Sequence, residues 1–185
     1  MIKIAICDDN TIDMGIIENI VINHMKKKDV QYSLDKYGDG EDLIKVSENT
    51  GIKYDLIFMD IFMMNSNGMD IAKVIKKYSN NTQVVFSTSS TEHAIEAYDI
   101  EAIGYLLKPI EVEKCIRILD RFLNEYAKKD KVAIFKSKGK LIKTEYDNIV
   151  YLESRNTTVI VHLVKGEIIK IYGKSLFEIL YIKFI

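Results

Sequence analysis

The stretch "IAICDDN", residues 4–10, places two adjacent aspartates directly after a run of small and branched apolar residues. A strand this uniformly apolar is typical of a parallel sheet that helices cover on both faces. Two like charges at its end repel each other and are costly to desolvate unless a cation lies between them. One hypothesis is therefore that Asp8 and Asp9 bind a metal ion. The other is that they begin a solvated turn, in which Asp9, Asn10 or Thr11 caps the next helix.

Outward from this stretch, apolar runs alternate with amphipathic stretches as far as residue 129. The expected strands are 2–7, 30–34, 54–60, 83–90 and 104–109. The expected helices lie near 11–27, from the turn at 37–42 to Gly51, around 71–75, at 91–98 and at 111–128. Because parallel neighbours need crossover helices of one preferred hand, this order predicts an α/β fold with a doubly wound, five-stranded parallel sheet.

Polar side chains gather where these strands end, and in such folds the functional site lies at the carboxyl ends of the strands. They are Asp8 and Asp9 after the first strand, Asp60 after the third, Ser87 and Thr88 after the fourth, and Lys108 after the fifth. Several carboxylate oxygens with few other ligands suit Mg²⁺, which keeps some of its waters. The sequence therefore predicts a Mg²⁺ site at this edge.

This set of side chains supports phosphoryl transfer. With the cation offsetting charge repulsion, Asp60 can attack a phosphoryl donor as a carboxylate nucleophile. Lys108 can then hold one transferred oxygen by charge and Thr88 another through its hydroxyl.

Residues 1–129 resemble the flavodoxin-like, CheY-like receiver domain of two-component response regulators. The resemblance rests on "CDDN", "DLIFMDIFM....G", "VVFSTSS" and "GYLLKP", in the order of that family. It implies that Asp60 is the phosphoacceptor. It further implies that Asp8, Asp9 and the backbone carbonyl of Phe62 bind Mg²⁺ together with Asp60.

The same resemblance implies a switch. Thr88 matches the switch hydroxyl, Tyr105 the switch aromatic and Lys108 the invariant lysine, whose bond to Pro109 is cis in the family. Phosphorylation adds about −1.5 to −2 charges, so Thr88 is expected to move toward the new oxygens and Tyr105 to turn inward. The alternative is that Tyr105 is a static, half-buried tyrosine. Met64 stands where many receivers have proline, which predicts a more mobile loop or a different phosphoryl lifetime.

Residues 130–185 read as a second, mostly β domain, because apolar residues alternate in two segments with turn residues between them. The segments hold Ile149 and Tyr151, then Val159, Val161 and Leu163, and the turn residues are Gly139, Asn156 and Gly166. Basic residues outnumber acidic ones here, while the reverse holds before residue 130, and such a balance favours a polyanionic partner.

This second part resembles the N-terminal part of a LytTR-type DNA-binding domain, through "DNIVYLESRNTTVIVHL" and "GKSLFEIL". The resemblance implies DNA contacts from Arg155, Asn156, Thr157 and Thr158; the alternative is an ordinary polar turn. The family's domain is about twice as long as residues 131–185, so the domain is expected to be incomplete and its specific DNA binding weak or absent. The apolar tail is expected to make the chain associate; its members are Leu176, Phe177, Ile179, Leu180, Ile182, Phe184 and Ile185.

Together these features predict a response regulator that a sensor histidine kinase phosphorylates, that forms a homodimer when phosphorylated, and that controls transcription. It is expected to assist its own phosphorylation and dephosphorylation but not to be a turnover enzyme. The composition is that of a globular protein with no membrane span, so a cytoplasmic location is expected. Cys7 and Cys115 are expected to be core thiols.

Two alternatives come from other classes. A haloacid-dehalogenase-type phosphatase also uses an aspartate nucleophile, a Ser or Thr and a Lys. It needs its nucleophile at the end of the first strand with a second Asp two residues later. In this sequence the residue two positions after Asp8 is Asn10. The other alternative is a receiver that acts only as a protein-interaction module and has lost DNA binding.

Overall fold

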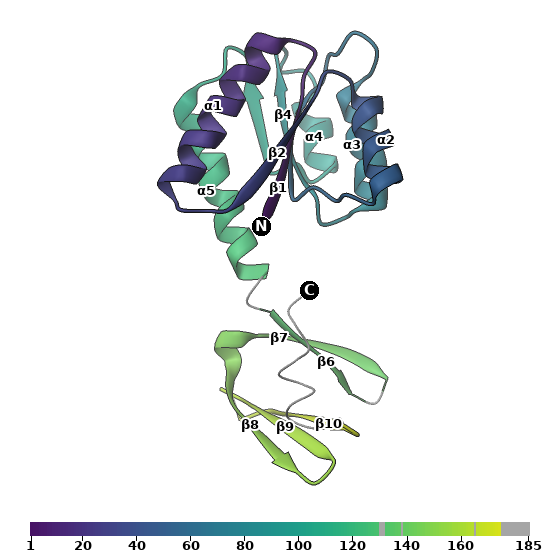
Figure 1. Ribbon diagram of the computed structural model, residues 1–185, viewed down its shortest axis with the longest axis vertical. Helices are drawn as coiled ribbons and strands as arrows, with labels where there is room; N and C mark the ends of the chain where they lie inside the picture. The colour runs from purple at the N-terminus through teal and green to yellow at the C-terminus, as the bar shows by residue number, and fades with distance from the viewer. Residues whose placement is uncertain (130–131, 138, 165, 175–185) are drawn as a thin grey trace. The chain divides into compact units, whose positions relative to one another are not determined.

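The computed structural model describes residues 1–129, 132–137, 139–164 and 166–174, and its chain folds as two compact units, Met1–Leu123 and Asn124–Ile185 (Figure 1). The apolar tail that is expected to drive association, residues 176–185, lies outside the described residues.

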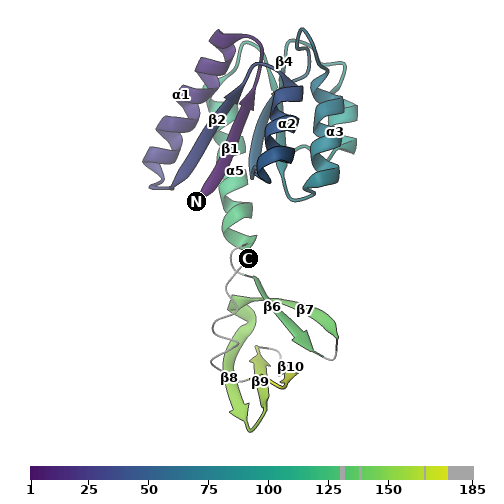
Figure 2. The same ribbon diagram turned by 45° about the vertical axis from the view of Figure 1, so that its right-hand side comes forward.

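The first unit is a five-stranded parallel sheet in the order β2-β1-β3-β4-β5. Its strands are β1 (Ile2–Cys7), β2 (Tyr32–Tyr37), β3 (Leu56–Asp60), β4 (Gln83–Thr88) and β5 (Gly104–Leu107). Its helices are α1 (Thr11–Lys27), α2 (Gly40–Thr50), α3 (Gly68–Tyr78), α4 (Ala94–Asp99) and α5 (Val112–Lys129). Figures 1 and 2 show α1 and α5 over one face of the sheet and α2, α3 and α4 over the other. The predicted doubly wound α/β fold is confirmed.

The central strands β1, β3 and β4 are buried almost throughout, which explains their continuous apolar runs. Cys7 ends β1 and Cys115 lies in α5, and both are buried free thiols, as expected. Burial raises the pKa of each thiol to about 12, and nearby carboxylates add to the effect at Cys7. Both cysteines are therefore protonated core residues at neutral pH.

Short polar side chains begin the helices at the carboxyl edge of the sheet. The side-chain oxygen of Asn10 accepts the N–H of Ile12 at 2.9 Å, and that of Asn67 accepts the N–H of Met69 at 2.8 Å. Because Asn10 is the cap of α1, neither Asp8 nor Asp9 is needed for that role. Helix α4 begins at Ala94, three residues later than the expected Thr91, after a residue whose side chain makes no capping bond.

The second unit consists of the hairpin β6–β7 and the antiparallel sheet β10-β9-β8. Its strands are β6 (Val132–Ser137), β7 (Lys140–Glu145), β8 (Ile149–Arg155), β9 (Thr158–Leu163) and β10 (Ile168–Tyr172), with a 3-10 turn at Tyr146–Asn148. Apolar residues of β6, β9 and β10 form its core, namely Ala133, Phe135, Val159, Val161, Ile169 and Ile171. The predicted antiparallel β module is confirmed.

Two local features of this unit bear on the sequence pattern. Gly139, Asn156 and Gly166 have positive φ angles, which is typical of the turns predicted at these positions. A bulge between Ile149 and Tyr151 shifts the register of β8, so Ile149 packs against the core while Tyr151 is 53% exposed. The alternation of Ile149 and Tyr151 correctly indicates a strand, but the two side chains do not share a face, because a bulge breaks the two-residue period.

Candidate functional site

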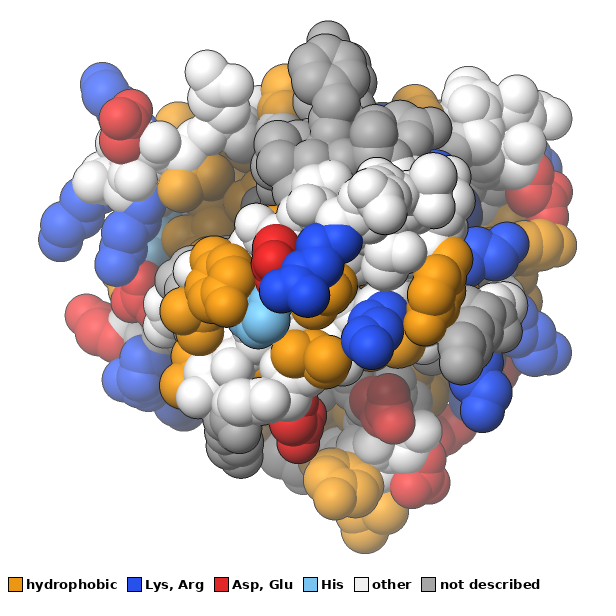
Figure 3. Space-filling view, turned by 90° about the horizontal axis from the view of Figure 1, so that it is seen from below, with side chains coloured by type: hydrophobic (Ala, Val, Ile, Leu, Met, Phe, Trp, Pro, Cys, Tyr) orange, Lys and Arg blue, Asp and Glu red, His pale blue; other side chains and the backbone are white. Residues whose placement is uncertain are grey.

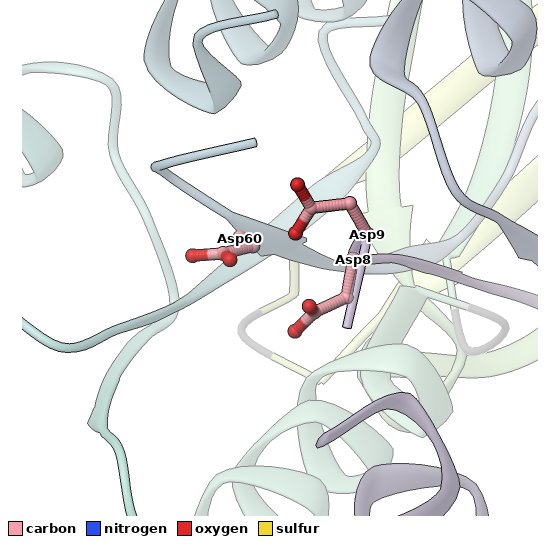
Figure 4. Close-up of side chains that lie close together, drawn as sticks. All are labelled: Asp8, Asp9 and Asp60. Atoms are coloured by element: carbon pink, nitrogen blue, oxygen red, sulfur yellow. The ribbon is translucent and has the colours of Figure 1, made fainter. Parts of the chain in front are cut away.

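Three carboxylates meet at the carboxyl edge of the first unit. Asp8 and Asp9 follow β1, Asp60 ends the neighbouring β3, and Figure 4 shows the three side chains beside one another. One oxygen from each lies within 4.8 Å of the others. Asp8 and Asp60 are buried and Asp9 is exposed. The cluster predicted from separate strand ends is thus brought together by the parallel pairing of β1 and β3.

Lys108 joins this cluster from the loop after β5. Its Nζ lies 2.9 Å from Asp8 Oδ2, 2.9 Å from Asp60 Oδ2 and 3.0 Å from Asp13 Oδ2. Burial works against the charged ammonium, but the contacts with Asp8, Asp60 and Asp13 outweigh it and raise the pKa of Lys108. Lys108 therefore stays protonated at neutral pH. The Lys108–Pro109 bond is cis, as the resemblance implied.

Asp8 is fully buried, and its two carboxylate oxygens have different partners. Its Oδ1 accepts the N–H of Asn10 at 2.9 Å, and its buried Oδ2 lies 2.9 Å from the ammonium of Lys108. Burial raises the pKa of Asp8, and the Lys108 contact only partly opposes this. Three carboxylates whose oxygens lie this close together fit a hard divalent cation such as Mg²⁺.

Asp9 and Asp60 also hold the loop between β3 and α3. Asp9 Oδ2 accepts the N–H of Met64 at 2.7 Å, and Asp60 Oδ1 accepts the N–H of Phe62 at 3.3 Å. Proline has no N–H, so the Asp9 contact depends on a residue other than proline at position 64. Phe62 thus lies next to the cluster; the role of its carbonyl as a ligand stays a prediction.

The two predicted switch residues meet at Ser90. Thr88, the fully buried last residue of β4, accepts the N–H of Ser90 through its Oγ1 at 3.3 Å. The hydroxyl of Tyr105, on the neighbouring β5, donates to the carbonyl oxygen of Ser90 at 2.7 Å. The loop after β4 therefore links Thr88 to Tyr105 through a single residue, and Tyr105 is partly buried in this arrangement.

The sequence pattern does not reveal that Asp13 and Ser90 contact residues of the site. Asp13 is an acidic residue in the first turn of α1, where such residues are common in any helix. Ser90 lies in a loop of polar residues. What distinguishes both is a tertiary contact, with Lys108 in one case and with Tyr105 in the other.

In the second unit, the four predicted DNA-contacting residues lie together at the β8–β9 turn, with Asn156 at a φ of 53°. Arg155 is exposed, and its Nε lies 2.6 Å from Glu153 Oε1. Tyr151 stacks on His162 with ring centroids 4.1 Å apart. Figure 3 shows basic, acidic and hydrophobic side chains interspersed on the face seen from below. This turn has one basic side chain, and a neighbouring acid offsets its charge.

A doubly wound five-stranded sheet, with an acidic cluster and a lysine at its carboxyl edge, defines a flavodoxin-like signalling domain. The chain belongs to the response regulator receiver domain family, whose model matches residues 4–120. The crystal structure of the response regulatory domain of protein MrkE from Klebsiella pneumoniae is similar, with 27% identity and a TM-score of 0.60. It covers 68% of this chain and 98% of the MrkE domain.

Longer relatives match as well. The chain is 28% identical over 123 residues to the sensory transduction protein LytT of Bacillus anthracis, a match that covers 66% of this chain and 47% of LytT. It is 26% identical over 165 residues to the transcriptional regulatory protein NatR of Bacillus subtilis, which covers 86% of this chain and 68% of NatR. The chain thus spans less than half the length of LytT. Among the described residues, no helix has the length and apolar character needed to cross a bilayer.

Proposed function

We propose that this chain is a response regulator that a sensor histidine kinase phosphorylates on Asp60, and that its second unit passes the signal to transcription. The observation that carries the proposal is the position of Lys108, whose ammonium contacts both Asp60 and Asp8 at 2.9 Å. A lysine there can hold an oxygen of a phosphoryl group attached to Asp60. The family match and the names of the LytT and NatR relatives support the same reading.

Asp60 is the proposed nucleophile. A carboxylate oxygen of Asp60 attacks the phosphorus of a phosphohistidine or of a small acyl phosphate, the bond to the donor's leaving group breaks, and an acyl phosphate forms. Asp8, Asp9 and the Phe62 carbonyl, with Asp60 itself, would hold Mg²⁺, which supplies charge neutralisation between acceptor and donor. The chain in this way assists its own phosphorylation and the later hydrolysis of the acyl phosphate on Asp60. It is not a turnover enzyme.

The proposed switch uses the Ser90 link. Because Thr88 Oγ1 accepts from Ser90, its hydroxyl proton is available for a phosphoryl oxygen. Movement of Thr88 would pull on Ser90, which also holds the Tyr105 hydroxyl, so Tyr105 would be released to turn inward. The nearby helices carry exposed apolar side chains, with Ile95 81%, Tyr98 82% and Val112 47% exposed. We assign homodimer formation on phosphorylation to this surface.

The phosphoacceptor function is tested with the purified chain and acetyl phosphate. We expect intact-mass spectrometry to show one added phosphoryl group per chain when Mg²⁺ is present. We expect almost none when the metal is chelated, because the acidic cluster then repels the anionic donor. Equal phosphorylation with and without divalent metal would contradict the proposed role of the cluster.

The second unit is proposed to be the N-terminal part of a LytTR-type DNA-binding domain, with domains at 1–129 and 130–185. The antiparallel strands and the placement of Arg155, Asn156, Thr157 and Thr158 at one turn support this proposal. The pairing of Arg155 with Glu153 leaves little uncompensated positive charge there. We therefore propose that the contribution of this turn to DNA affinity is modest and mainly electrostatic.

Retention on a DNA column tests this proposal. We expect weak retention that falls steeply as salt rises, and a loss of several-fold in affinity for Arg155→Gln, because phosphate contacts release counterions. The matched control is Lys114→Gln in the first unit, since Lys114 also pairs with a neighbouring acid, Glu111, at 2.6 Å. Equal losses for the two variants, or no retention of the wild type at low salt, would refute DNA contact at the β8–β9 turn.

A further inference from the structure

Asp13 is a fourth carboxylate at the site, and the proposed phosphoryl transfer does not use it. Its Oδ2 lies 3.0 Å from Lys108 Nζ, nearly the same distance as the oxygens of Asp8 and Asp60, and its side chain is 20% exposed. Lys108 is thus held by three carboxylates at once. A phosphoryl group on Asp60 would need the same ammonium.

An ordinary helix-start role does not explain the orientation of Asp13. An acidic residue at the third helical position commonly reaches back to the N–H of the capping residue. In α1 that N–H belongs to Asn10 and already donates to Asp8 Oδ1 at 2.9 Å. The Asp13 carboxylate instead contacts Lys108, which follows β5, the strand at one edge of the sheet.

The charge balance of the site shows what Asp13 adds. The ionised carboxylates of Asp8, Asp9 and Asp60 are neutralised by the Lys108 ammonium and one bound divalent cation. The carboxylate of Asp13 gives the same site one net negative charge. Its contact with Lys108 also occupies one N–H donor of the ammonium. Both effects work against an incoming anionic phosphoryl donor, because like charges repel strongly where the side chains are partly buried.

We propose that Asp13 is a positioning residue that restrains phosphorylation: it holds Lys108 in the resting site and competes with the phosphoryl oxygens for the ammonium. This inference rests on the proposed phosphoacceptor function of Asp60. It assigns Asp13 a role in the rate of phosphorylation and in the stability of the phosphorylated state, not in the chemistry of bond formation.

The test compares Asp13→Asn, Asp13→Glu and wild type with acetyl phosphate, at a Mg²⁺ concentration shown by titration to saturate each protein. We expect Asp13→Asn to be phosphorylated about three- to tenfold faster in an intact-mass time course, since one opposing charge is removed. Asp13→Glu keeps the charge and should stay near the wild-type rate. Binding of beryllofluoride, a phosphoryl mimic, should tighten by a similar factor in Asp13→Asn.

The matched control is Asp70→Asn. Asp70 is the third residue of α3, which, like α1, follows an asparagine cap, and its nearest basic partner is Lys73 on the same helix. We expect this variant to keep the wild-type rate. An Asp13→Asn rate at or below the wild-type rate, or an equal gain in Asp70→Asn, would overturn the inference while leaving Asp60 as the acceptor. A wild type that takes up no phosphoryl group would instead overturn the proposed function, and the inference with it.

Discussion

Asp60→Asn is expected to lower phosphoryl uptake from acetyl phosphate about 100-fold or more, because an amide is not a nucleophile at neutral pH. The substitution is nearly isosteric, and the amide oxygen can still accept the N–H of Phe62, so the loop should keep its position. A time course of intact mass with Mg²⁺ present measures the effect. The unfolding temperature, measured alongside, shows whether the variant is folded.

Asp9→Asn is the control that distinguishes the loss of a metal ligand from the loss of the phosphoacceptor. Asp9 is exposed and holds Met64, whereas Asp60 is buried at the strand end beside Lys108. We expect Asp9→Asn to slow phosphorylation by about tenfold, and we expect added Mg²⁺ to recover part of the rate, since one charged oxygen is lost from the metal site. A phosphorylated species that forms readily in Asp60→Asn would show that another residue accepts the phosphoryl group.

Gly68→Ala is expected to have the largest effect on stability. A Cβ at Gly68 would overlap the carbonyl oxygen of Asp60 and lie 2.9 Å from its carbonyl carbon. These are backbone atoms of a central strand, and they cannot move aside as the end of a flexible side chain can. We expect a loss of about 3 kcal/mol in the free energy of unfolding, from overpacking and from displacement of the acceptor. Denaturant titration measures it.

Gly15→Ala is the matched control for that loss. Gly15 lies inside α1, and nothing lies within 4 Å of a Cβ built on it. Alanine favours a helix over glycine by about 1 kcal/mol, so this variant should be more stable than the wild type. The two substitutions are chemically identical and are expected to have opposite signs. A Gly68→Ala protein as stable as Gly15→Ala would contradict the close approach of Gly68 to Asp60.

Much of the first unit could be predicted from its strand ends. Continuous apolar runs identify buried parallel strands, and the parallel arrangement then places Asp8, Asp60 and Lys108 at one edge. The sequence left open whether the aspartates or a neighbour cap α1, and the structure shows that Asn10 does so. The Asp13 and Ser90 contacts could not be predicted, because each depends on where a distant strand places its partner.

The second unit was less predictable for a different reason. Alternation identifies β8 and β9 correctly, but a bulge of one residue reverses which side chains face the core, and no residue type marks it. Tyr151 is consequently an exposed residue stacked on His162, and Leu152 packs against the core. Helix α4 was also hard to place from the sequence, because it begins after His93, whose side chain makes no capping bond.

The site of the added phosphoryl group tests the central claim most directly. The wild-type chain is phosphorylated with acetyl phosphate and Mg²⁺, reduced with borohydride, which converts a phosphorylated aspartate to homoserine, and digested for peptide sequencing by mass spectrometry. The geometry of Asp60 and Lys108 predicts homoserine at position 60 and nowhere else. Homoserine at Asp8, Asp9 or Asp13, or its absence from position 60 in a phosphorylated chain, would contradict the account.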